Sequence, residues 1–170
     1  MQDYVAAGNN NIGFYSETNI QSYYGGDYTA VRAAYDVLQF CTVVAYRWNY
    51  PFNTMYVSSV TVNANNNYTV SGPYQIGTQG AANYCENTVY DSNSNLVHLS
   101  YKRSTGKYMR TLTQSGSNSV TVGSEYTLPF TTNGIPLMTF DSNANSLVIS
   151  YKDEGNSNYP TVIAGVVSGS

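Results

Sequence analysis

Charged side chains are scarce in this chain of 170 residues. Asp, Glu, Lys and Arg make up 10% of it, whereas globular proteins carry about a quarter. The formal net charge is −3, from ten acidic and seven basic residues, which argues against nucleic acid as a partner. Asn, Ser, Thr, Gln and the tyrosine hydroxyls must therefore solvate the surface. Such a composition is typical of extracellular, cell-surface or virion proteins, and we expect one of these locations.

Histidine and cysteine are almost absent. His98, Cys41 and Cys85 cannot supply the four ligands of an ordinary zinc site without help from carboxylates. A disulfide between Cys41 and Cys85 would close a loop of about 45 residues, and two buried free thiols are the alternative. No glycine-rich phosphate loop follows a strand, and no Cys-x-x-Cys motif occurs. We therefore expect no cofactor.

Long apolar runs are also missing. No stretch of about 18 apolar residues occurs, so we expect no membrane span. Disorder is excluded, because aromatic residues make up 14% of the chain and the net charge is low. The length fits a single domain over residues 1–170 with one core.

One segment has the period of a helix. Asp27 stands at the N-cap position, and the apolar residues that follow recur at i, i+3, i+4 and i+7: Val31, Ala34, Tyr35 and Leu38. This spacing predicts a helix over residues 27–40. The next residues, 41–48, alternate as a buried strand would.

The rest of the chain has the pattern of short strands separated by turns rich in Asn, Ser and Gly. We expect them at 56–62, 68–71, 84–90, 96–102, 108–113, 119–122, 126–130, 137–140, 146–152 and 161–167. About ten short strands and one helix predict a mainly β fold, a β-sandwich of Greek-key or jelly-roll type. A β-trefoil is the weaker alternative.

Two segments repeat each other without a gap. Residues 90–102 and 140–152 share an aromatic residue, Asp-Ser-Asn-x-Asn, a β run and Ser-Tyr-Lys, which indicates one type of hairpin used twice. Oxygen ligands stand at alternate positions in both copies, as at the start of a calcium loop. The sixth-position Gly and the twelfth-position Glu of that motif are missing, so we favour structural turns. The weak calcium candidates are Asp91, Asn93, Asn95, Asp141, Asn143 and Asn145.

Catalytic residues are hard to find. His98 lies in the middle of a predicted strand, and the second repeat has Val148 in its place, which indicates an ordinary strand position. A glycosidase pair of Glu86 and Glu125 has no support from spacing. We therefore expect no enzyme. Four basic residues surround one predicted turn and could contact anions, although a solvated hairpin tip is the simpler interpretation: Lys102, Arg103, Lys107 and Arg110.

Tyrosine clusters and apolar terminal segments favour a structural role. The uncharged run 160–167 could complete a neighbour's sheet, and residues 1–15 could be a second exchanged arm. The alternative is that 160–167 is a core strand of its own subunit. The interaction candidates are Tyr23, Tyr24, Trp48, Tyr50, Thr161, Val162, Ile163, Val166 and Val167.

We therefore expect an assembly subunit of a virion or an extracellular filament, with other copies of itself as partners. The alternative function is a lectin-like, carbohydrate-binding β-sandwich in which Trp48 and exposed tyrosines stack on sugar rings. Glycans would then be the partners.

Overall fold

The computed structural model of the chain describes residues 28–48, 53–65, 67–77, 84–116 and 119–166. Within these ranges the chain forms eleven strands and no α-helix. Sheet 1 contains β1 (Tyr28–Asp36), β2 (Cys41–Trp48), β3 (Thr54–Val62) and β4 (Tyr68–Gln75). Sheet 2 contains β5 (Tyr84–Asp91), β6 (Leu96–Arg103), β7 (Gly106–Gln114) and β8 (Val120–Thr127). Sheet 3 contains β9 (Leu137–Asp141), β10 (Ser146–Asp153) and β11 (Tyr159–Gly165).

The mainly β sandwich is confirmed, but its connectivity is simpler than the Greek key or jelly roll expected. In each sheet every strand pairs antiparallel with the next strand in the chain, so each sheet is a meander. The two strands predicted at 119–122 and 126–130 are instead the single strand β8 and the loop after it, because β8 continues through Gly123. The C-terminal run forms β11, which pairs with β10 of its own sheet.

The helix predicted over residues 27–40 is wrong. Residues 28–36 form β1, residues 37–40 form a turn, and Asp27 lies outside the described residues. A β-bulge between Thr29 and Arg32 shifts the register of β1 against β2 and breaks the strict alternation that marks a strand in sequence. Asp36 forms the turn, since its Oδ1 accepts hydrogen bonds from the amides of Leu38 and Gln39, both at 3.0 Å.

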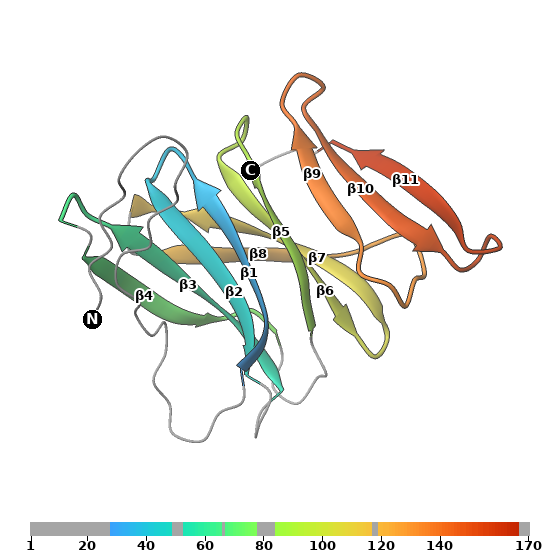
Figure 1. Cartoon of the computed structure of the whole chain (residues 1–170), viewed down its shortest axis with the longest axis horizontal. Helices are drawn as coiled ribbons and strands as arrows, with labels where there is room; N and C mark the ends of the chain where they lie inside the picture. The colour runs from blue at the N-terminus through green and yellow to red at the C-terminus, as the bar shows by residue number, and fades with distance from the viewer. Residues whose placement is uncertain (1–27, 49–52, 66, 78–83, 117–118, 167–170) are drawn as a thin grey trace, which may run out of the picture.

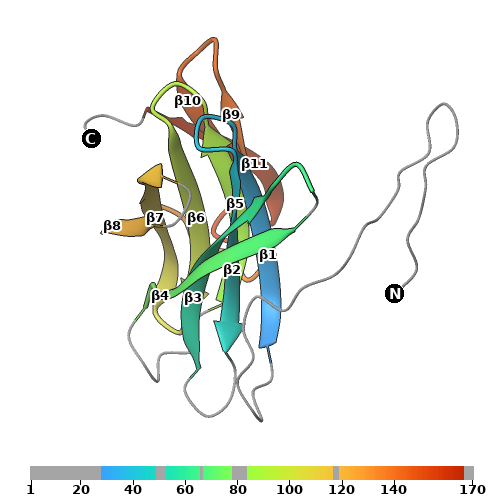
Figure 2. The same ribbon diagram turned by 90° about the vertical axis from the view of Figure 1, so that its left-hand side faces the viewer.

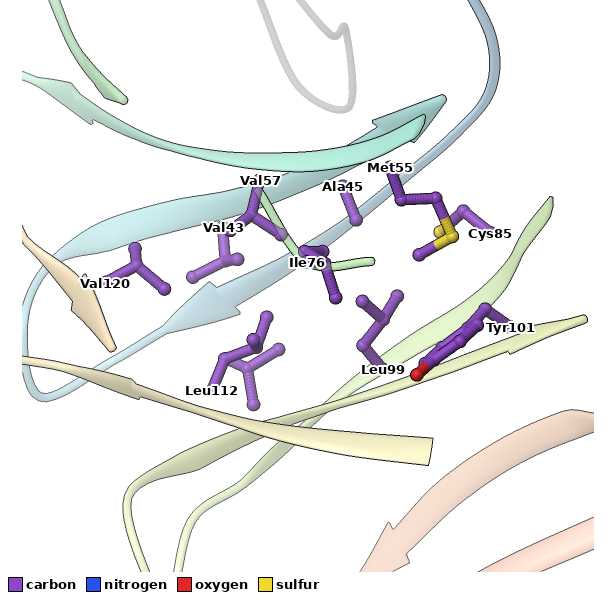
Figure 3. Close-up of a cluster of buried hydrophobic side chains, with 11 residues drawn as sticks. Val43, Ala45, Met55, Val57, Ile76, Cys85, Leu99, Tyr101, Leu112 and Val120 are labelled. Carbon is purple, nitrogen blue, oxygen red and sulfur yellow. The ribbon is translucent and has the colours of Figure 1, made fainter. Parts of the chain in front are cut away.

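The three sheets are stacked face to face in three layers, with sheet 2 in the middle (Figure 1). Figure 2 shows sheet 1 in front of the other two. The core between sheets 1 and 2 contains Val43 and Val57 on one side and Leu99, Tyr101 and Leu112 on the other (Figure 3). A second core lies between sheets 2 and 3, where Leu147 and Ile149 pack against Val89 and Met109.

The sheets are copies of one unit. The repeat seen twice in the sequence forms the first hairpin of sheets 2 and 3, and residues 35–47 form the same hairpin in sheet 1. All three copies are thirteen residues long. Each begins with an aromatic residue followed by Asp and ends with Tyr followed by a basic residue. The stacking also repeats, because Val97 and Leu99 face sheet 1 while Leu147 and Ile149, their counterparts, face sheet 2.

Candidate functional site

Three equivalent aspartates stabilise the three repeated turns. Asp91 Oδ1 accepts hydrogen bonds from the amides of Asn93 (2.9 Å) and Ser94 (3.0 Å). Asp141 Oδ1 does the same for Asn143 (3.0 Å) and Ala144 (3.1 Å), as Asp36 does in the first hairpin. The fourth residue after each Asp has a positive φ: 52° at Phe40, 56° at Asn95 and 50° at Asn145. The Asp and the two Asn residues of the repeat are therefore explained by their role in forming a tight turn.

The three turns form a row at one end of the molecule, at the top of Figures 1 and 2. Asn93 Nδ2 donates to the carbonyl of Ser142 (2.9 Å) and to Asn145 Oδ1 (3.0 Å), which joins the second turn to the third. The first turn lies beside the second, because β1 and β5, the strands that lead into them, are in contact. Burial and the neighbouring Asp36 carboxylate raise the pKa of Tyr90. Among the described residues, no group of three His, Cys, Asp or Glu side chains is arranged to hold a metal ion.

His98 is fully buried between sheets 2 and 3. In the tautomer protonated at Nε2, the ring donates to Asp91 Oδ2 (3.4 Å), and Nδ1 accepts from the Thr111 hydroxyl (3.4 Å). Burial lowers the pKa of His98, and Asp91 opposes this only in part, so the ring is neutral at pH 7. Burial acts to raise the pKa of Asp91, but amide hydrogen bonds from Ser94 and Asn93 and the contact with His98 outweigh it and lower that pKa. His98 therefore connects Asp91 of the second turn to Thr111 of β7, and it does not face a solvent-filled site.

The two cysteines are buried free thiols, and no disulfide is found. Cys85 packs near Met55 (Figure 3), and the ring of its neighbour Tyr84 lies 4.0 Å from the Arg47 guanidinium. Arg47 is six residues from Cys41 along β2, about 20 Å away at the usual rise of a strand. Burial raises the pKa of the Cys85 thiol to about 12 and also raises that of Cys41, so neither thiol is reactive at pH 7.

The basic hairpin expected at residues 102–110 is largely neutralised by carboxylates. Lys107 is buried and pairs with Glu86. Arg103 and Arg110 both contact Glu125. Each of the two glutamates therefore pairs with its own cations. Lys102 lies 3.5 Å from Asn133 Oδ1, a neutral group.

The aromatic residues singled out in the sequence fall into two sets. Trp48 is only 9% exposed and packs against Tyr56, with ring centroids 6.1 Å apart. It therefore does not offer a flat surface to a sugar ring. Tyr23, Tyr24 and Tyr50 lie outside the described residues, as does Val167.

Some of the interaction candidates on and after β11 face the core, and others are exposed. Ile163 packs against the core between sheets 2 and 3, and Thr161 is half-buried. Val162 and Val166 are 63% and 66% exposed. Val162 lies on the outer face of sheet 3 with Leu137, which is 61% exposed, and Val148. The corresponding face of sheet 1 is covered by sheet 2, and the corresponding face of sheet 2 is covered by sheet 3. On sheet 3 the same face is the outer one.

A cleft of about 480 Å³ opens between sheets 2 and 3. Its walls come from β6, β7, β8, β10 and β11, from the loop after β8 and from Val166, and they carry no charged side chain. Met109, Leu147 and Ile163 supply apolar surface, and Thr111 and Ser124 supply hydroxyl groups. A cleft of this size falls in the range of roughly 300–1,000 Å³ that ligand sites occupy. Nothing in the sequence pointed to it.

Sequence reasoning missed Asp36 and the third copy of the repeat. The signal was present, because residues 35–47 align with 90–102 and 140–152 without a gap. The helical spacing of the alanines and valines before it concealed the match. No helix in the described part of the chain is long and apolar enough to cross a membrane. Comparison of the chain with protein-family models, with curated proteins and with solved structures finds no match.

Proposed function

We propose that this chain is a non-catalytic structural subunit that associates with other copies of itself. The observation that carries the proposal is the outer face of sheet 3, where Leu137 and Val162 are both more than half exposed. In this three-layered stack, the corresponding faces of sheets 1 and 2 are covered by a neighbouring sheet. Exposed apolar surface of this kind marks association sites in soluble proteins.

The remaining chemistry supports a structural role over catalysis. The single imidazole is buried, the thiols are buried, and the glutamates discussed above are paired with cations. Carbohydrate binding called for Trp48 and exposed tyrosines as stacking platforms; Trp48 is buried and only tyrosines such as Tyr126 and Tyr159 are exposed, which makes self-association the better supported function. The low charge and high Asn, Ser and Tyr content favour an extracellular filament, a cell-surface layer or a virion as the setting.

Light scattering coupled to size-exclusion chromatography tests the proposal. We expect the mass of the full chain to rise above the monomer's 18.6 kDa as concentration increases. Val162→Lys should lower the degree of association, because it places a charge on the outer face of sheet 3. Ala64→Lys is the control, since Ala64 is exposed in the turn between β3 and β4 of sheet 1. A parent protein that stays monomeric up to millimolar concentration contradicts the proposal.

A further inference from the structure

Sheet 3 has three strands where sheets 1 and 2 have four. In the complete sheets a fourth strand pairs with the third, β4 with β3 and β8 with β7. Within the described residues, no strand pairs with the outer edge of β11, which lies at the right of Figure 1. The backbone N–H and C=O groups of such an edge are ready to pair with another strand.

The cleft lies where the repeat places a fourth strand of sheet 3. In the first pair of sheets, β8 lies against β3, and its Val120 joins the core between them. The corresponding strand of sheet 3 would pair with β11 and lie against β7. The cleft is lined by Met109 and Thr111 of β7 and by Ile163 and Gly165 of β11. An unpaired edge and an open apolar cleft therefore coincide at one place.

We propose that this edge and cleft accept an extended strand from a second copy of the chain, and that the donor is residues 4–16. The inference rests on the proposed function and takes this strand exchange as the contact without which the outer face of sheet 3 does not hold two copies together. The donor carries no charge between Asp3 and Glu17, which matches a cleft without charged side chains. Ile12 and Phe14 alternate, so in an extended strand both side chains point to the same side, into the cleft. Main-chain hydrogen bonds to β11 supply affinity, and the two apolar side chains set the register.

The donor and the acceptor are different parts of the chain. Each copy can therefore receive a strand from one neighbour and give a strand to another. Such a head-to-tail contact builds an open filament or a closed ring, according to the rotation between copies. Blocking either part alone leaves the other part of that copy intact.

Gly165→Glu blocks the acceptor without an evident cost to the fold. A Cβ atom at Gly165 would meet no atom within 4 Å, and the residue lines the cleft. The added carboxylate would have to be buried without a partner when a strand enters. Ile12→Glu with Phe14→Glu blocks the donor. Ser142→Glu is the control for added charge, because Ser142 is exposed in the third turn, outside the cleft.

Mixing the two blocked proteins gives the decisive experiment. We expect each alone to be monomeric by light scattering, while the Ser142→Glu control associates like the parent. An equimolar mixture should form a 1:1 complex of about twice 18.6 kDa and nothing larger, because only one working donor meets one working acceptor. If the mixture stays monomeric, or if each variant associates like the parent, the acceptor inference is overturned and the proposed function stands.

A peptide separates the two proposals if the parent itself is monomeric. Labelled peptide of residues 4–16 should then bind the full chain and bind Gly165→Glu at least about tenfold more weakly. That result keeps the acceptor and overturns the proposed function. Absence of peptide binding overturns the acceptor as well. A small apolar dye that binds the cleft with the same sensitivity to Gly165→Glu, while the peptide does not bind, identifies a ligand pocket in its place.

Discussion

Phe40 occupies a backbone conformation that suits asparagine. Its φ is 52° and its side chain is 73% exposed, while the two matching turns carry Asn95 and Asn145 at this position. The left-handed conformation is unfavourable for a bulky residue and mild for Asn. We therefore expect Phe40→Asn to raise the free energy of unfolding by about 1 kcal/mol in chemical denaturation. Asn95→Phe should lower it by more than this, because it also removes the hydrogen bond that the Tyr90 hydroxyl donates to Asn95 Oδ1 (2.8 Å). Equal stability of all three proteins would contradict this account.

The two repeat aspartates differ in burial, and so should their variants. Asp91 is fully buried and also contacts His98, whereas Asp141 is exposed and stabilises only its turn. We expect Asp141→Ala to cost about 1 kcal/mol and Asp91→Ala about 3 kcal/mol in thermal or chemical unfolding. Added calcium or a chelator should leave the melting temperature unchanged, because Oδ1 of each Asp already accepts amide hydrogen bonds. A chelator-sensitive shift of several degrees would restore the calcium interpretation.

His98 should give the fold a pH dependence. Its pKa is lowered in the folded state, so the unfolded chain binds more protons as the pH falls below about 6.5, and stability falls with it. His98→Val removes this term. The difference in unfolding free energy between parent and variant should therefore shrink between pH 7 and pH 5, as measured by urea denaturation. Val43→Ala is the control, which should keep the slope of the parent, and parallel profiles for His98→Val would refute the assignment.

At the scale of elements, β11 is an edge strand of sheet 3. It has one strand neighbour and contributes Ile163 to the second core. Removing residues 160–170 deletes this strand, and burial of an Ile side chain alone contributes about 1.5–3 kcal/mol. We expect β9 and β10 to lose hydrogen-exchange protection while the core between sheets 1 and 2 keeps it. Full protection of β10 in the truncated chain would show that β11 is not part of the folded unit.

Sequence predicted the strands well where polar turns separate alternating runs, and failed where local spacing misled. The strands expected at 84–90, 96–102 and 146–152 match β5, β6 and β10 within a residue or two at each end. Strand β1 and the turn after it were taken for a helix because alanine and valine fit both structures and the bulge near Arg32 removes the alternation, whereas the strand predicted at 41–48 is β2. The cleft and the edge of β11 could not be predicted, since they depend on how separate sheets stack and on a strand that sheet 3 lacks.

At the scale of the whole molecule, the chain is a short stack of repeated sheets. Sheet 2 contributes one face to the core with sheet 1 and the other face to the core with sheet 3, so stability comes from contacts between neighbours in the stack. Stacks of this kind need terminal units with polar outer faces to stay monomeric. The outer face of sheet 3 exposes Leu137 and Val162, and no strand among the described residues pairs with the edge of β11, which is why we expect this chain to associate through sheet 3.

Hydrogen exchange of the β11 amides at two protein concentrations tests this expectation most directly. At low concentration the outward amides of Tyr159–Gly165 should exchange quickly, because no strand within the described residues pairs with that edge. At high concentration we predict slower exchange in β11 and in the cleft-lining part of β7, with β2 and β3 unchanged. Identical β11 exchange at both concentrations, in a sample whose mass shows association, would contradict the account and place the contact elsewhere on the molecule.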